Sequence, residues 1–275
     1  MDQGWRSQGE RVERLPLWGE DDRALDLYLP GTADPGSPPM TVVCLAGGGY
    51  ARRSWHEGPA VALWLAMHGF AAVDVPYTTA EDVPENEPLG ERPLRDACRA
   101  IRVVRDHADQ FGLSPSRVAV LGFSAGGHLA GSAALLHRET DARDDLADAW
   151  PGRPDAAALI YPVVSMVPPC HEGSVNNLLG RDASEAERAS RSLQTRVTPD
   201  APPLFLLHAQ DDAYVPISGW LKLAAAARSA GIPCESHVYP EGGHGFGLAL
   251  DHPRLSSWPP LLLSWLSSLA PDPTG

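Results

Sequence analysis

The stretch Leu121-Gly122-Phe123-Ser124-Ala125-Gly126-Gly127 lies between an apolar run, residues 117–121, and a segment of helix-forming residues, 128–136. Its form is G-x-S-x-G between an expected strand and an expected helix, which predicts a tight turn that raises the serine hydroxyl above the end of a sheet. Gly122 and Gly126 suit such a turn because it crowds the backbone. The free N–H groups at the start of the helix favour negative charge beside the serine. A glycine-rich turn capped by a serine is the alternative, and the rest of the chain must decide.

Outside this turn, apolar runs alternate with helical patterns. Strands are expected over 23–29, 40–46, 70–75, 117–121, 156–162, 203–208 and 234–239. Helices are expected over 59–68, 94–105, 128–136 and 258–269, in a charged piece near 184–193, and in an alanine-rich segment that ends at 230. This alternation predicts the α/β class, with a mostly parallel central sheet and helices on both of its faces.

The domain organisation is expected to be simple. Residues 1–22 are polar and are expected to form an N-terminal lead-in, and residues 23–275 a single domain. The irregular stretch 163–202 is expected to be a short insertion after the sixth strand, lying over the carboxyl ends of the strands. It either shapes a pocket or packs without touching a ligand, and the residues leave both possibilities open.

Composition limits the class of partner. The chain has 275 residues, 43% of them hydrophobic, which is enough for a full core. A formal net charge of −13 argues against nucleic acid and against anionic membrane surfaces. Residues 1–10 contain no apolar signal segment, and no run is long enough to span a bilayer, so a cytoplasmic location is expected. The four cysteines are scattered without a C-x-x-C pair and are expected to be reduced.

Three loops that follow expected strands hold Ser124, Asp212 and His244, in this order. Loops at the carboxyl ends of strands are where groups meet in an open α/β sheet. A serine hydroxyl needs a base to become a nucleophile, and the base needs a carboxylate to orient it. The order Ser…Asp…His is the chain order of the α/β-hydrolases. The sequence therefore predicts catalysis by these three residues.

Each member of this set has a competitor. Asp211 competes with Asp212, which we prefer because 212–216 matches the D-x-x-V-P pattern of these enzymes. His128 and His208 compete with His244, but a histidine on a helix or at a strand end is more often structural. His244 has glycines on both sides, which suits a loop that must present an imidazole.

The predicted chemistry also needs donors for a developing oxyanion. We expect these to be the backbone N–H groups of Gly48, Gly49 and Ala125. No metal site is expected, because the histidines and carboxylates show no ligand spacing.

Further side chains receive weaker expectations. Tyr50, Trp55 and Tyr214 are candidates for the pocket wall, although core packing is favoured for Trp55. Arg95, Arg99, Arg102 and Arg105 are expected to face solvent from one helix.

Four motifs together resemble bacterial α/β-hydrolase esterases of the acetyl-xylan and feruloyl esterase type, the BD-FAE-like hydrolases. They are 47–50 (GGGY), 122–128 (GFSAGGH), 212–216 (DAYVP) and 242–247 (GGHGFG). The resemblance implies the α/β-hydrolase fold and hydrolysis of short-chain carboxylic esters, often acetyl groups on sugars, with a small-molecule ester as partner and no cofactor. The neighbouring lipase-like branch usually has histidine before these glycines, whereas this chain has Ala46.

Two other functions remain open from the residues alone. One is an amidase or peptidase on the same fold, although the chain has no room for the large accessory domain usual in such peptidases. The other is a non-catalytic binding protein with the hydrolase fold, although such proteins typically lose a member of the triad.

Overall fold

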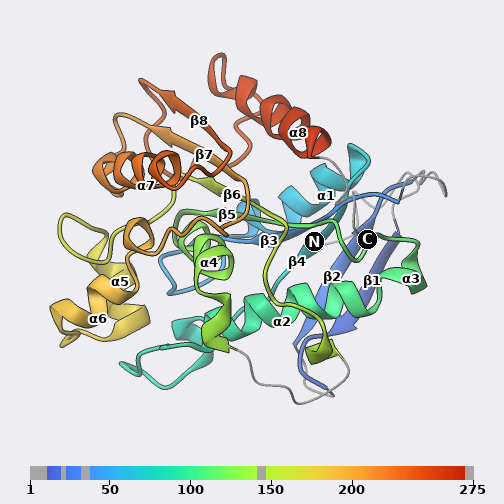
Figure 1. Ribbon diagram of the computed structural model, residues 1–275, viewed down its shortest axis with the longest axis horizontal. Helices are drawn as coiled ribbons and strands as arrows, with labels where there is room; N and C mark the ends of the chain where they lie inside the picture. Colours follow the sequence, from blue (N-terminus) through green and yellow to red (C-terminus); the bar gives the residue numbers. More distant parts are fainter. Residues whose placement is uncertain (1–10, 20–22, 32–37, 141–146, 270–275) are drawn as a thin grey trace, which may run out of the picture.

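The computed structural model describes residues 11–19, 23–31, 38–140 and 147–269 (Figure 1). Its centre is an eight-stranded sheet with the order β1-β2-β4-β3-β5-β6-β7-β8. The strands are β1 (Arg11–Pro16), β2 (Ala24–Leu29), β3 (Thr41–Leu45), β4 (Ala71–Asp74), β5 (Val118–Phe123), β6 (Ala156–Ile160), β7 (Leu204–Ala209) and β8 (Cys234–Tyr239). β2 pairs antiparallel with β1 and β4, and all other pairs are parallel. The predicted α/β-hydrolase architecture is confirmed.

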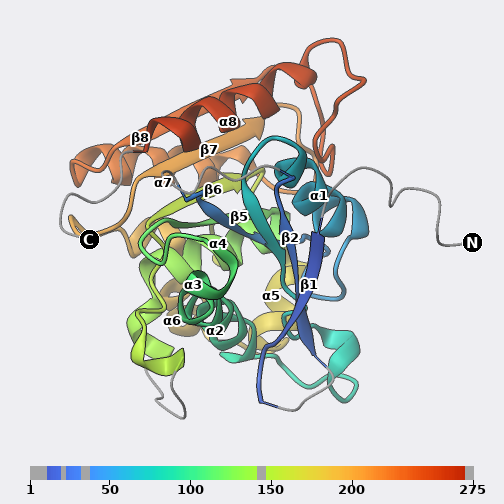
Figure 2. The same ribbon diagram turned by 90° about the vertical axis from the view of Figure 1, so that its right-hand side faces the viewer.

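Helices cover both faces of this sheet (Figure 2). The described helices are α1 (Pro59–Met67), α2 (Arg92–Asp106), α3 (Ala108–Phe111), α4 (Ser124–Leu135), α5 (Glu172–Leu179), α6 (Glu185–Ser190), α7 (Ile217–Ser229) and α8 (Trp258–Ser268). Apolar side chains of α2, α4 and α7 pack on one face, and those of α1 and α8 pack on the other. Since both faces are covered, the central strands β3, β5 and β7 are buried along their whole length and consist mostly of apolar residues.

The sheet begins earlier in the chain than the sequence indicated. Arg11–Pro16, assigned to the lead-in, forms β1 and pairs with β2 over its full length. β1 is an edge strand with three charged side chains in six residues, so it carries little of the apolar pattern of the inner strands. The other strands lie within two residues of their expected bounds.

The arginines of α2 correct a second expectation. Arg99, Arg102 and Arg105 are buried rather than solvated. Their guanidinium groups donate to backbone carbonyl oxygens, for example Arg99 Nε to Leu17 O at 2.9 Å. Long side chains can bury their stems and still satisfy their charged heads, so the helical period alone did not separate buried arginines from exposed ones.

The insertion follows β6 as expected and contains α5 and α6, drawn in yellow at the left of Figure 1. It is tied to the segment before α2, because Leu89 N–H donates to Asn177 O at 3.0 Å and Gly90 N–H to Leu178 O at 2.8 Å. All four cysteines are unpaired. Within the described part of the chain, no helix combines the length and apolarity needed to cross a bilayer.

Candidate active site

The turn between β5 and α4 has the geometry that its sequence predicts. Ser124 is the first residue of α4, and its φ of 53° lies in the left-handed region. A Cβ on Gly122 would lie 2.0 Å from Gly126 O, and one on Gly126 would lie 2.1 Å from Leu45 O. Both positions therefore require glycine, and the turn holds Ser124 at the end of the sheet.

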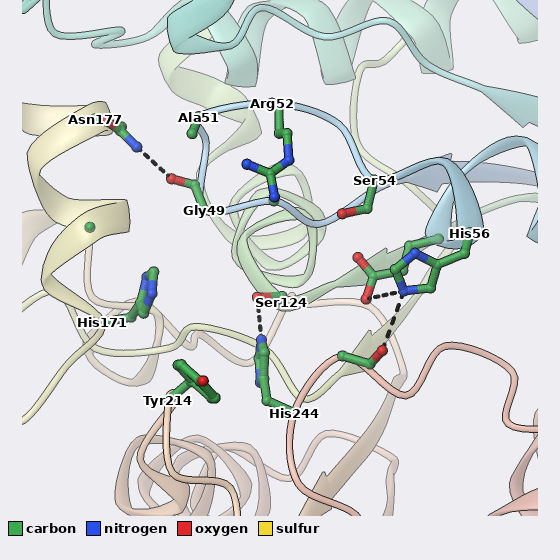
Figure 3. A pocket seen from close by; sticks show the side chains of 14 residues that line it. Gly49, Ala51, Arg52, Ser54, His56, Ser124, His171, Asn177, Tyr214 and His244 are labelled. Carbon is green, nitrogen blue, oxygen red and sulfur yellow. Dashed lines mark hydrogen bonds and ion pairs between the residues drawn. The ribbon is translucent and has the colours of Figure 1, made fainter. Parts of the chain in front are cut away.

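The structure brings the three predicted residues together, and Figure 3 shows two of them, Ser124 and His244, facing each other. Ser124 Oγ lies 2.8 Å from His244 Nε2, and His244 Nδ1 lies 2.6 Å from Asp212 Oδ2. The Asp212 carboxylate is fully buried, and the His244 side chain is 17% exposed. A serine, an imidazole and a carboxylate are thus in hydrogen-bond contact in the order that proton transfer requires.

Backbone donors fix Asp212. Its Oδ1 accepts the N–H groups of Tyr214 and Val215, each at 2.9 Å. Burial opposes ionisation of this carboxyl, but its hydrogen bonds to His244 and to these N–H groups prevail and hold its pKa below the usual value. Asp212 is therefore an anion that accepts from the ring at neutral pH.

Asp211, the competing aspartate, has a different position. Its Oδ1 accepts the N–H groups of Gly242 at 2.9 Å and Gly243 at 2.8 Å. Asp211 therefore holds the loop that carries His244, and it does not contact the imidazole of His244 in the structure.

The competing histidines are both buried. His128 Nε2 donates to Arg191 O at 2.7 Å, so its Nδ1 accepts from Tyr50 Oη at 2.7 Å. His208 Nε2 donates to Val215 O at 3.1 Å. Neither histidine lines the cavity beside Ser124.

The three glycines after β3 form a loop beside Ser124, here called the glycine loop (47–49). The Gly47 N–H donates to Glu57 Oε2 at 3.0 Å, while Gly48 and Gly49 line the cavity. Gly48 has a φ of 129°, and a Cβ there would lie 2.2 Å from Arg52 O, so no other residue fits. Ala125 is buried directly after Ser124, at the start of α4.

A buried pair that no sequence pattern indicated, Glu57 and Tyr161, connects the glycine loop with the loop that carries His244. Glu57 is 3% exposed, and its Oε1 accepts from Tyr161 Oη at 2.6 Å. Tyr161 Oη in turn accepts the N–H of Gly247 at 2.9 Å, and the Tyr161 ring packs edge-on to His244 with 5.0 Å between ring centroids. No local motif marks Glu57, whose partners are remote in sequence.

A cavity of about 360 Å³ opens beside Ser124. The glycine loop and the segment after it form one wall, and the insertion contributes His171, Gly173 and Asn177 (Figure 3). The Asn177 side chain donates to Gly49 O at 2.9 Å. The insertion therefore shapes the cavity, which was one of its two expected roles.

The three aromatic candidates have different positions. Tyr214 lines the cavity as expected. Tyr50 does not, because it is fully buried against His128, which corrects that expectation. Trp55, for which core packing was favoured, is 65% exposed. Within the residues that the structure describes, no cluster of three or more His, Cys, Asp or Glu side chains could hold a metal ion.

Comparisons with known proteins point to one family. The BD-FAE family model matches residues 25–226. The chain is 34% identical over 218 residues to endo-1,4-beta-xylanase B of Butyrivibrio fibrisolvens, and 33% identical over 214 residues to an acetylxylan esterase of Xylanibacter ruminicola. These matches cover 79% and 75% of this chain but only 34% and 41% of the two relatives, so the chain spans well under half of their length.

Comparison with solved structures also points to esterases with the same fold. An acetyl ester-xyloside bifunctional hydrolase from Caldicellulosiruptor lactoaceticus superposes with a TM-score of 0.84 at 34% identity, covering 97% of this chain and 98% of that one. A thermophilic esterase of Thermogutta terrifontis superposes with a TM-score of 0.76 at 24% identity, covering 96% and 95%, which supports the fold.

Proposed function

This chain belongs to the BD-FAE family of α/β-hydrolases, and from that premise we propose that it is a serine hydrolase of short-chain carboxylic esters. One observation carries the proposal: the unbroken hydrogen-bonded series from Ser124 through His244 to Asp212, at 2.8 and 2.6 Å. The relatives and structural neighbours named above include ester hydrolases, so the reaction class agrees with the geometry.

The reaction begins at Ser124. Its Oγ attacks the ester carbonyl carbon while His244 Nε2 takes the hydroxyl proton. The positive charge on the ring is stabilised by Asp212, which also holds the proton of Nδ1 in place. The oxyanion that forms accepts hydrogen bonds from the N–H groups of Gly48, Gly49 and Ala125.

Collapse of this intermediate breaks the bond to the alcohol oxygen, and His244 delivers its proton to that oxygen. The acyl group remains on Ser124 Oγ. Water then attacks the acyl carbon with His244 as base, which releases the acid and restores the serine. These steps use side chains and backbone N–H groups of the chain together with one water molecule, without a cofactor.

We propose acetyl esters of sugars, or similar small esters, as the substrate class. This part rests on the relatives, whose names include an acetylxylan esterase and an acetyl ester-xyloside hydrolase. The cavity of about 360 Å³ is of a size that suits a small ligand.

A series of p-nitrophenyl esters from acetate to octanoate tests the proposal. The wild type should favour acetate, and Ser124→Ala should lose turnover of every ester. Ser132→Ala is the matched control, because Ser132 is a buried serine of the same helix outside the cavity. Turnover that survives in Ser124→Ala would contradict the mechanism, and amide hydrolysis without ester hydrolysis would favour an amidase.

A further inference from the structure

One charged side chain in the cavity is not used by the proposed mechanism. Arg52 lines the cavity, and in Figure 3 its guanidinium points into it from the segment after the glycine loop. Its stem lies over that loop, since Arg52 Cγ is 3.4 Å from the position of a Cβ on Gly48. Arg52 is an exposed residue, and its guanidinium reaches the cavity from beside the glycine loop.

Arg52 differs from its sequence neighbour. Arg53 donates to Asp82 Oδ2 at 2.7 Å and to Tyr77 O at 2.5 Å, so its charge is compensated. The Arg52 guanidinium forms no hydrogen bond or ion pair with any residue that the structure describes. A cation in a ligand cavity without a protein partner is a candidate for binding an anion.

The carboxylate that lines the same cavity is not available to Arg52. Glu57 is buried, and its two oxygens accept from Gly47 N–H and Tyr161 Oη. Both of its oxygens are thus occupied by hydrogen bonds within the protein. Among the described lining residues, Arg52 is the one arginine and Glu57 the one acidic residue.

The opposite wall adds a neutral donor. His171 Nδ1 accepts the backbone N–H of Ser174 at 3.1 Å, so in the neutral ring the proton lies on Nε2. Burial, together with the nearby His244, lowers the pKa of His171, which keeps the ring neutral at pH 7. His171 and Arg52 therefore both offer N–H donors to a ligand in the cavity.

A second groove restricts where an anion could bind. It meets the cavity at Asn177, and its lining includes Glu85, Glu87, Asp182 and Glu187. These carboxylates disfavour a negative group in the groove, although Arg181 also lines it. A negative group on the substrate is therefore favoured at Arg52 rather than beyond Asn177.

From these contacts we propose that the preferred ester substrate carries a carboxylate group, and that Arg52 binds this carboxylate and so determines specificity. This inference rests on the proposed ester hydrolysis and names a narrower substrate class. The carboxylate has two possible sources: the alcohol part, as in an acetylated uronic acid, or the acyl part, as in the monoester of a dicarboxylic acid.

Two substrate pairs separate these sources. 4-Acetoxybenzoate and 4-acetoxybenzamide place the carboxylate or its neutral amide in the alcohol part. Monomethyl glutarate and methyl 4-carbamoylbutanoate place the same groups in the acyl part. For each pair, the quantity measured is the ratio of kcat/KM for the carboxylate to kcat/KM for the amide.

We expect Arg52→Gln to lower this ratio about 10-fold in one of the two pairs, mainly through KM, because a charged hydrogen bond is lost. Arg52→Lys should keep part of the preference, since it retains charge but not the planar fork. The matched control is Arg228→Gln on α7, which changes the net charge equally outside the cavity. It should leave both ratios unaltered. Ratios that change less than twofold with Arg52→Gln in both pairs would overturn the inference.

Binding without turnover separates this inference from the proposed function. In Ser124→Ala protein, calorimetric titration with the same four esters reports affinity alone. Tighter binding of a carboxylate, lost on adding Arg52→Gln, would support the inference even if the wild type hydrolysed none of these esters. Absence of turnover in the wild type would count against the proposed ester hydrolysis only. Equal affinity for carboxylates and amides would overturn the role of Arg52.

Discussion

His244 Nδ1 lies 2.6 Å from Asp212 Oδ2, whereas the adjacent carboxylate of Asp211 binds the backbone of the loop that carries His244. Two consecutive acidic residues thus have separate structural tasks. Asp212 orients the imidazole, and Asp211 holds Gly242 and Gly243 in position. The sequence pattern favoured Asp212 but gave no role to Asp211, because the loop that it holds lies about 30 residues further along the chain.

This division predicts unequal effects of one substitution at neighbouring positions. Asp212→Asn should lower kcat for p-nitrophenyl acetate about 1,000- to 10,000-fold, because an amide no longer stabilises the required tautomer and charge of His244. Asp211→Asn should lower kcat less than about 10-fold, because the amide oxygen still accepts the two glycine N–H groups. Steady-state kinetics with both purified proteins checks this, with circular dichroism to show that both are folded. A larger loss for Asp211→Asn would contradict the assignment.

The Glu57–Tyr161 pair predicts a loss of stability. Tyr161→Phe removes the hydroxyl that donates to Glu57 and accepts from Gly247, so a buried carboxylate oxygen and an N–H lose their partner. Unfolding in urea should show a decrease in the free energy of unfolding of about 1–3 kcal/mol.

The matched control for this substitution is Tyr239→Phe. The Tyr239 hydroxyl also forms a hydrogen bond, to Ser257 Oγ at 2.6 Å, but this bond is exposed. Its loss should cost less than about 1 kcal/mol, since water can replace the partner. Equal losses in the two variants would mean that burial of the Glu57–Tyr161 pair has no special weight.

The insertion predicts an effect on catalysis from outside the triad. Asn177→Ala removes the hydrogen bond to Gly49 O and should loosen the glycine loop. We expect kcat to fall about 10-fold with a smaller change in KM, because an oxyanion donor acts mainly in the transition state. Asn176→Ala is the control: its side chain lines the neighbouring groove and not the cavity beside Ser124. If KM alone rises in Asn177→Ala, the loop does not support the oxyanion.

His128 predicts a pH dependence of stability. Burial lowers the pKa of His128 from the ordinary histidine value of 6.5 to about 4. Below pH 6.5 the unfolded chain binds a proton that the folded chain does not, so stability falls as the pH falls from 6.5 toward 4. Between pH 7 and pH 5 this residue alone should remove about 2 kcal/mol.

The test compares variants, because other groups titrate in the same range; the pKa of Asp74 is raised to about 7. Urea unfolding of His128→Gln should show a decrease between pH 7 and pH 5 that is about 2 kcal/mol smaller than the wild-type decrease. His68→Gln, at an exposed histidine, should match the wild-type decrease. A wild-type slope in His128→Gln would show that His128 is not the cause.

The parts of the fold that the sequence predicted are those with a strong local pattern. Strands buried on both faces are continuous apolar runs, so β3, β5 and β7 were located to within a residue or two. β1 was missed because three of its six residues are charged, so it shows neither an apolar run nor a strict alternation. α5 was missed because eight polar and apolar residues after several prolines show little helical period.

The predicted site follows the same rule. Ser124, Asp212 and His244 were identifiable because each lies in a loop after a strand, and the fold brings these loops to one edge. Glu57, Tyr161 and His171 were missed because each contributes through tertiary contacts; the Glu57–Tyr161 hydrogen bond joins residues 104 positions apart. Such contacts leave no pattern in either local segment.

The nucleophilic role of Ser124 is the central claim, and covalent labelling tests it most directly. The protein is treated with a fluorophosphonate, and the adduct is located by intact-mass measurement and peptide mapping. If Ser124 is the nucleophile, each chain should carry one adduct, on Ser124, which is absent in Ser124→Ala and retained in Ser132→Ala. An adduct on another residue, or a folded wild type that stays unlabelled, would contradict it.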